Sequence, residues 1–141
     1  LRTPEVDFVS REVYNSLFTL HATVMIFLWI VPAGAGFANF LIPLMIGAKD
    51  MAFPRLNAVA FWMIPAGGIL LISSLVLGDA ADAGWTSYPP LSLVTGQLGE
   101  GIWIISVLLL GTSSILGAIN FLVTLLKMRT PGMSTTQMPL F

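Results

Sequence analysis

Cysteine and charge are the two features that this sequence most clearly lacks. It contains no cysteine, and 9% of its 141 residues are charged, against about 25% in ordinary soluble domains. The absence of cysteine excludes disulfide frameworks, CxxC redox pairs, thiolate metal sites and a cysteine nucleophile. So few charged groups cannot cover a soluble globule with polar surface, and 56% of the residues are hydrophobic, so we expect lipid to be the solvent. The net charge of −1 gives no indication of a nucleic-acid partner.

The chain also lacks the common signatures of soluble enzymes. The sequence contains no glycine-rich phosphate loop, no Ser–His–Asp set and no paired carboxylate site. No signal-peptide pattern precedes the first apolar stretch, and the first residue is Leu1 rather than an initiator methionine. We therefore expect an internal fragment of a longer protein.

Three nearly uncharged stretches are long enough to cross a bilayer, which takes about 20 apolar residues. They lie at about 14–46, 57–77 and 101–126. They do not alternate polar and apolar residues, which argues against a β-barrel, and a backbone in lipid must satisfy its own hydrogen bonds. The sequence therefore predicts an all-α fold, a polytopic transmembrane helix bundle, with residues 1–141 forming a single partial membrane domain.

Basic residues in the connecting segments orient the predicted bundle. The loop 47–56 and the tail 127–141 each carry two basic residues, whereas the loop 78–100 carries acidic residues and no basic one. The positive-inside rule places 47–56 on the cytoplasmic side and 78–100 outside. The expected location is a bacterial plasma membrane, with the chain as a multi-pass integral protein.

Small residues and proline mark the faces of these spans. Residues 33–36 and the set Gly111, Ser114 and Ala118 offer small faces for close helix contact. Pro32 removes a backbone N–H and predicts a kink in the first helix. Helices with such faces need more partners than these three spans supply.

His21 is the only histidine, and it lies inside the first apolar stretch. Ionisable residues within a span usually face the bundle interior. A neutral imidazole there could bind iron or copper through one nitrogen, or it could hydrogen-bond across a helix interface. Position alone favours neither reading, and a second metal ligand would have to come from another segment.

Polar residues follow the first span toward the cytoplasmic side. Asn39 lies 18 residues after His21, which at about 3.6 residues per turn places both on one face. Asp50 lies at the cytoplasmic mouth, and Asn57 begins the next helix. A carboxylate below a line of amides could collect protons and feed a chain of water molecules. Spacing alone favours another reading, in which Asp50 pairs with a neighbouring Lys or Arg at the membrane interface.

Two aromatic residues carry polar groups near the outer side. Trp85 lies in the loop 78–100, where it could belong to an interfacial aromatic belt or donate its N–H to an anionic group such as a propionate. The sequence alone favours the belt. Tyr14 stands about two turns before His21 on the same face, so its phenol could meet lipid headgroups or a cofactor carboxylate.

Several blocks in the same order along the chain resemble subunit I of the haem–copper terminal oxidases. They are His21–Phe27, Gly36–Asn39, Pro43–Asn57, Gly84–Leu91, Ser113–Asn120 and Pro139–Phe141. The resemblance covers essentially the whole chain. It implies the second, third and fourth helices of a twelve-helix subunit.

The resemblance also implies cofactor contacts. His21 matches the family's axial ligand to the iron of a low-spin haem, for which haem A is the expected type. Trp85 matches a residue hydrogen-bonded to a propionate of the oxygen-reducing haem. Tyr14 matches a residue near a propionate of the low-spin haem. The ligands of the second haem and of copper belong to segments outside this chain.

The same resemblance implies a proton pathway. Asp50 matches its entrance, and Asn39 and Asn57 match amides that line it. Ala60 stands where the family often has a serine, a change expected to alter hydration of the path.

The implied function is that of a cytochrome c oxidase, which reduces O2 to water with coupled proton translocation. Its implied partners are subunits II and III, cytochrome c and the lipid bilayer. A quinol oxidase of the same superfamily is the first alternative, but those relatives often carry His and Gln where this chain has Val13 and Ser16. A non-catalytic membrane bundle is the second alternative, and it leaves the match of motifs unexplained.

Overall fold

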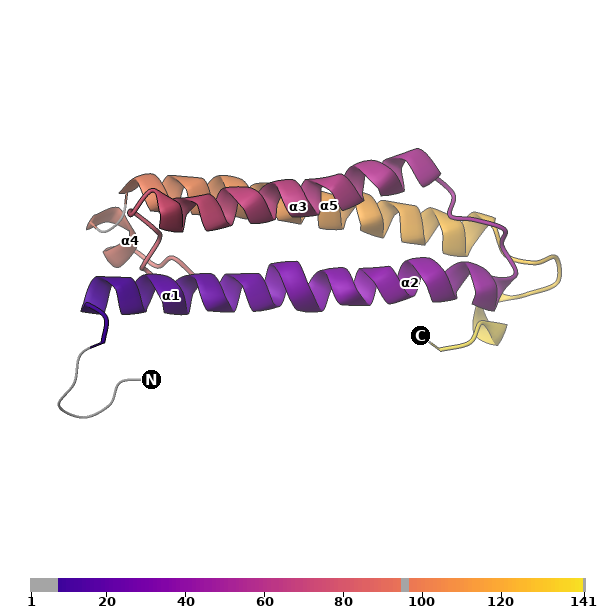
Figure 1. The fold of residues 1–141 in the computed structure, drawn as a ribbon. Coiled ribbons are helices and arrows are strands. Elements are labelled where there is room, and N and C mark those ends of the chain that lie inside the picture. Colours follow the sequence, from indigo (N-terminus) through magenta and orange to yellow (C-terminus); the bar gives the residue numbers. More distant parts are fainter. Residues whose placement is uncertain (1–7, 95–96, 141) are drawn as a thin grey trace.

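Three long helices lie side by side with alternating direction (Figure 1). The computed structural model describes residues 8–94 and 97–140, so the N-terminal charges at Arg2, Glu5 and Asp7 lie outside the described residues. The first rod is continuous and consists of α1 (Arg11–Thr23), a π-helical stretch η1 (Val24–Ile30) and α2 (Val31–Ile46). The other long helices are α3 (Pro54–Val76) and α5 (Gln97–Lys127), with a short α4 (Leu91–Val94) and a 3-10 turn η2 (Thr135–Gln137) at the two ends.

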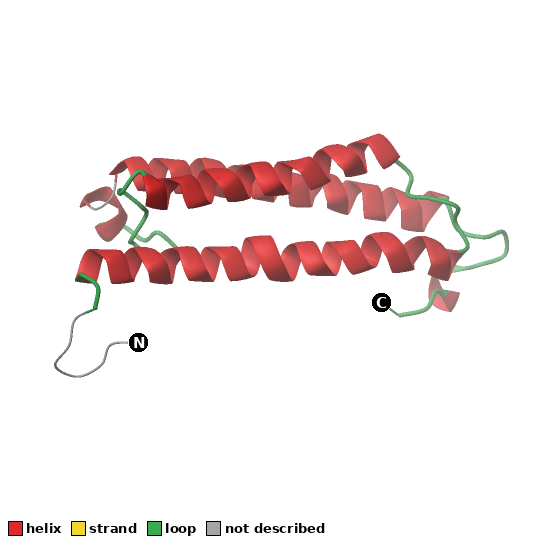
Figure 2. Ribbon diagram, in the orientation of Figure 1, coloured by secondary structure: helices red, strands yellow, loops and turns green. Residues whose placement is uncertain are grey.

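The predicted all-α class is confirmed, because the described residues form helices joined by loops (Figure 2). Each long helix is apolar and long enough to cross a membrane. The first spans 36 residues, about 54 Å at 1.5 Å per residue, and so exceeds a hydrocarbon core of about 30 Å. It must tilt or extend beyond the lipid.

Local chemistry sets the ends of the first rod. Ser10 caps its start, where the side-chain oxygen accepts the N–H of Val13 at 3.3 Å. Gly47 ends it with φ of +71°, a left-handed conformation that glycine adopts without a steric penalty. The connection 78–94 and the start of α1 lie at one end of the bundle, whereas the loop 47–53 and the segment after α5 lie at the other (Figure 1).

A π-helical stretch lies directly before Pro32, where the sequence predicts a kink. The N–H of Val31 donates to the carbonyl of Ile26, five residues back, just before the proline that lacks an N–H. A regular repeat of about 3.6 residues per turn therefore does not run from His21 to Asn39. The face shared by His21 and Asn39 was predicted from that regular repeat, and the two residues differ in burial, since His21 is exposed and Asn39 is partly buried.

Close helix packing uses glycines other than those predicted. A Cβ on Gly67 of α3 would lie 3.0 Å from the side chain of Leu110 in α5, and one on Gly68 would lie 3.3 Å from the side chain of Leu28. By contrast, a Cβ on Gly34, Gly36 or Gly111 would meet nothing within 4 Å. These predicted small faces therefore remain open within the described chain, and Gly67 and Gly68 instead lie at close contacts between the long helices.

Two apolar clusters hold the rods together. One lies near the loop 78–100 and contains Leu20, Leu71, Ala80, Ala81 and Trp103. The other lies near the opposite end, where Ala38, Ile42 and Ile46 of α2 pack against residues of α5 and of the tail. Most large apolar side chains elsewhere are exposed, which suits a surface turned toward lipid or toward further helices.

Candidate functional site

His21 lies on an open face of α1. Tyr14, Phe18, His21 and Met25 follow one another at helical spacing, and all four are exposed. In the part of the chain that the structure describes, the imidazole of His21 has no hydrogen-bond partner. The interface-histidine reading is therefore not realised among these three helices, and the ring nitrogens remain available to a metal.

A ladder of hydroxyl groups on the opposite face of α1 sets this orientation. The Thr23 hydroxyl donates to the carbonyl of Thr19 at 2.8 Å and accepts the indole N–H of Trp103 in α5 at 3.0 Å. Thr19 and Thr23 are almost fully buried, and each lies two residues from His21. Since residues two apart on a helix point in nearly opposite directions, fixing the threonines inward turns the histidine outward. The spacing of Thr19 and Thr23 on either side of His21 was the sequence signal for this ladder, and the sequence reasoning missed it.

Trp85 lies in a tight turn of the connection between α3 and α5. The N–H of Ser87 donates to the carbonyl of Gly84 at 3.0 Å and closes the turn. Trp85 is 42% exposed, and its indole N–H has no partner among the described residues. The indole N–H is thus free to donate to an acceptor outside the described residues. No hydrogen bond connects Trp85 to His21 or Tyr14 within the described chain.

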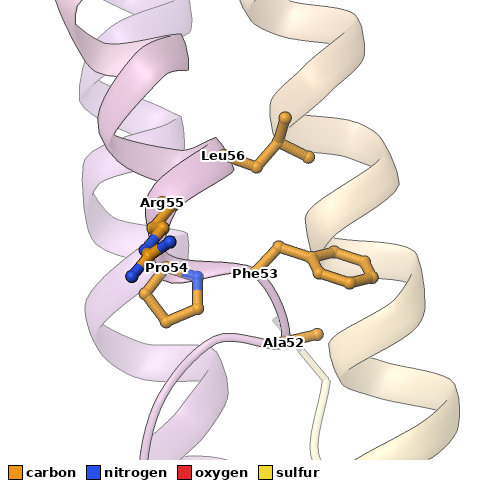
Figure 3. A pocket seen from close by; sticks show the side chains of 5 residues that line it. All are labelled: Ala52, Phe53, Pro54, Arg55 and Leu56. Carbon is orange, nitrogen blue, oxygen red and sulfur yellow. The ribbon is translucent and has the colours of Figure 1, made fainter.

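At the other end, Asp50 is exposed and forms no ion pair within the described residues. Its carboxylate accepts the N–H of Met51 at 2.7 Å. Arg55 points away from the side chains of Phe53 and Leu56, around which an open apolar depression forms at the start of α3 (Figure 3). The pairing of Asp50 with a neighbouring basic residue, which spacing alone favoured, is not observed.

Two buried polar residues of α5 hold the segment that follows Asp50. The amide of Asn120 accepts the N–H of Phe53 at 2.9 Å and donates to its carbonyl at 3.2 Å. The Thr124 hydroxyl accepts the N–H of Ala52 at 2.9 Å. The sequence reasoning did not assign either residue, although a polar pair four residues apart in an apolar span was a usable signal.

The two predicted amides differ in their surroundings. The side-chain N–H of Asn39 donates to the carbonyl of Ala35 at 2.8 Å, and its Oδ1 is buried without a partner among the described residues. Asn57 is partly buried in the first turn of α3. No hydrogen bond links Asp50, Asn39 and Asn57 within the described chain, so water would have to connect them.

Metal binding by these helices alone is not supported. Across residues 8–94 and 97–140, no three His, Cys, Asp or Glu side chains gather into a possible metal site. A metal held at His21 would therefore take its other ligands from a cofactor or from another segment.

Comparison with known proteins places the chain in context. The family model described as Cytochrome C and Quinol oxidase polypeptide I matches residues 1–141. The chain is 70% identical over 141 residues to Cytochrome c oxidase subunit 1 of Synechocystis sp., covering 100% of this chain and 25% of that protein. Proteins with the same description are 56% identical over 142 residues in Thermostichus vulcanus and 48% identical over 144 residues in Corynebacterium glutamicum, each covering 100% of this chain and respectively 26% and 25% of the relative. The chain thus spans about a quarter of the length of the curated relatives it matches.

Proposed function

The chain belongs to the family of Cytochrome C and Quinol oxidase polypeptide I, and on that premise we propose that it forms three membrane helices of the catalytic subunit of a respiratory terminal oxidase. The family's members are oxidoreductases of the membrane, and the relatives named above are bacterial. In the complete enzyme, electrons pass from cytochrome c through a low-spin haem to a haem–copper centre that reduces O2 to water, with coupled proton translocation.

The observation that carries this proposal is the exposed, unpaired imidazole of His21 on an otherwise apolar face. One nitrogen would hold the iron of a low-spin haem, and the apolar side chains of Phe18 and Met25 would border the macrocycle. The bound haem, expected to be haem A, supplies a reversible one-electron couple. Tyr14 on the same face, and Trp85 at the second haem, would direct polar hydrogens toward propionates.

The opposite end is proposed to take up protons. Asp50 is exposed and free of ion pairs, which suits a group that exchanges protons with bulk water. The buried, unpartnered Oδ1 of Asn39 would accept a hydrogen bond from an ordered water molecule. Asn57 at the start of α3 would be the second amide along the path.

Cytochrome c is proposed as the electron donor rather than a quinol. The printed descriptions of the relatives above are those of cytochrome c oxidases, and Val13 and Ser16 replace the His and Gln often found in quinol-oxidising members. Subunits II and III would surround the complete subunit. The second haem and copper would be held by segments outside this chain.

The test is a reduced-minus-oxidised optical spectrum of membranes that contain the complete subunit, with and without His21→Ala. We expect the low-spin haem band and the oxidation of reduced cytochrome c to be lost. Thr112→Val is the matched control, because the Thr112 hydroxyl is exposed on α5 and bonds only to the carbonyl of Leu108. Survival of the low-spin haem band and of turnover in His21→Ala would refute the proposal. If the unmodified enzyme turned over with a quinol but not with reduced cytochrome c, the electron donor would be a quinol instead of cytochrome c.

A further inference from the structure

The turn that carries Trp85 is held from two sides. The N–H of Gly84, the residue before the tryptophan, donates to the Thr19 hydroxyl of α1 at 2.9 Å. The hydroxyl of Ser87, two residues after the tryptophan, donates to the carboxylate of Glu100 in the first turns of α5. Two different long helices therefore fix the two ends of a turn that exposes Trp85.

Glu100 is an unusual residue for this chain. It is 6% exposed, although carboxylates are rarely buried and burial is costly unless the charge is hydrogen-bonded. Its partner Ser87 has φ of +50°, a left-handed conformation unfavourable for residues other than glycine. A buried acceptor that holds the Ser87 side chain would stabilise this backbone conformation and, with it, the course of the turn.

Thr19 connects the turn to the helix of His21. Its hydroxyl donates to the carbonyl of Asn15 at 2.8 Å and accepts from Gly84, so both of its polar functions are engaged. The residue is 1% exposed and lies two positions before His21. A single buried hydroxyl thus links the helix that bears the proposed haem ligand to the turn that bears the tryptophan.

We propose that Thr19 and Glu100 are positioning residues for Trp85, holding its indole N–H as a hydrogen-bond donor toward an anionic haem propionate. This inference rests on the proposed function. A donor that bonds a propionate disperses negative charge near the iron and therefore favours the reduced haem. Displacement of the indole should lower the midpoint potential of that haem, even where the protein remains folded.

The experiment is a redox titration of the oxygen-reducing haem in the complete oxidase complex, with haem content measured to verify assembly. Trp85→Phe keeps an aromatic side chain and removes the N–H, so it defines the full downward shift in midpoint potential. We expect Thr19→Val and Glu100→Ala each to give at least half of that shift. Glu100→Gln should give less than Glu100→Ala because an amide oxygen can still accept from Ser87, and the control Thr112→Val should give none.

Double variants separate positioning from a general structural effect. In the Trp85→Phe background, Thr19→Val and Glu100→Ala should add no further shift, because the group they position has gone. The positioning role alone would be overturned if the shifts in midpoint potential persisted at full size in that background. It would also be overturned if Trp85→Phe shifted the potential and neither Thr19→Val nor Glu100→Ala did. If Trp85→Phe causes no shift, both this inference and the proposed role of Trp85 fail. Should Glu100→Ala not assemble, the near-isosteric Thr19→Val decides.

Discussion

The clamp formed by Asn120 gives the sharpest quantitative prediction. This fully buried residue makes two hydrogen bonds to the backbone of Phe53, with its amide oxygen and its amide nitrogen. Asn120→Leu removes both bonds while keeping the number of side-chain heavy atoms, and it leaves the Phe53 N–H without a partner, whereas the Phe53 carbonyl retains the N–H of Asn57 at 3.0 Å. Each net hydrogen bond contributes about 1 kcal/mol, so we expect the local opening free energy of this segment to fall by about 2 kcal/mol.

The assay is hydrogen exchange of the peptide that contains Phe53, in the complete subunit. A loss of about 2 kcal/mol corresponds to roughly 30-fold faster exchange of the Phe53 amide, since each 1.36 kcal/mol is a factor of ten. Thr124→Val, which removes the acceptor for the Ala52 N–H at 2.9 Å, should accelerate exchange by about 5-fold through one lost bond. Unchanged exchange in Asn120→Leu would mean that α5 does not hold this segment, whereas the control Thr112→Val should leave it unchanged.

Three further predictions concern packing, proton entry and the hydroxyl ladder. Gly67→Val should overpack the contact with α5 and destabilise by about 1–3 kcal/mol, seen as faster thermal inactivation, whereas Gly101→Val enters open space and should be tolerated. Asp50→Asn should change stability by less than about 0.5 kcal/mol because Asp50 has no ion pair, yet steady-state turnover should fall at least tenfold. Thr23→Val should cost about 1–2 kcal/mol in thermal stability by leaving the Trp103 N–H unpaired, and much less in a Trp103→Phe background.

The helices could be predicted from the sequence because lipid imposes them. A long apolar stretch in lipid satisfies its backbone hydrogen bonds within itself by forming a helix, and three such stretches therefore predict the three rods. Their ends depend on local chemistry instead. The first helix begins at Arg11, ahead of the apolar stretch, because Ser10 caps it, and the third includes the buried acidic Glu100, whose carboxylate accepts from the half-buried hydroxyl of Ser87.

The π-helical stretch before Pro32 could not be predicted from a periodic pattern. It depends on how the freed carbonyls near the proline are satisfied, which a constant helical repeat does not describe. Likewise, the packing roles of Gly67 and Gly68 depend on which helix lies opposite, and sequence spacing alone does not supply that information.

For the candidate site, the sequence singled out residues but did not indicate their environments. His21 drew attention as an imidazole in an apolar span, whereas its outward orientation depends on the hydrogen bond that Trp103, 80 residues beyond Thr23 in the chain, donates to the Thr23 hydroxyl. Likewise, the absence of an ion pair at Asp50 depends on the conformation of the loop that carries it. Tertiary contacts decided both cases, and a single sequence gives no direct measure of such contacts.

The most direct test of the central claim is the ferric low-spin electron paramagnetic resonance signal of the complete subunit carrying His21→Gly, recorded with and without added imidazole. If His21 is the axial ligand, the signal is lost in the variant and returns when imidazole enters the space left by the side chain. If the signal persists at full intensity in the variant without imidazole, His21 does not bind the haem iron and the account is contradicted.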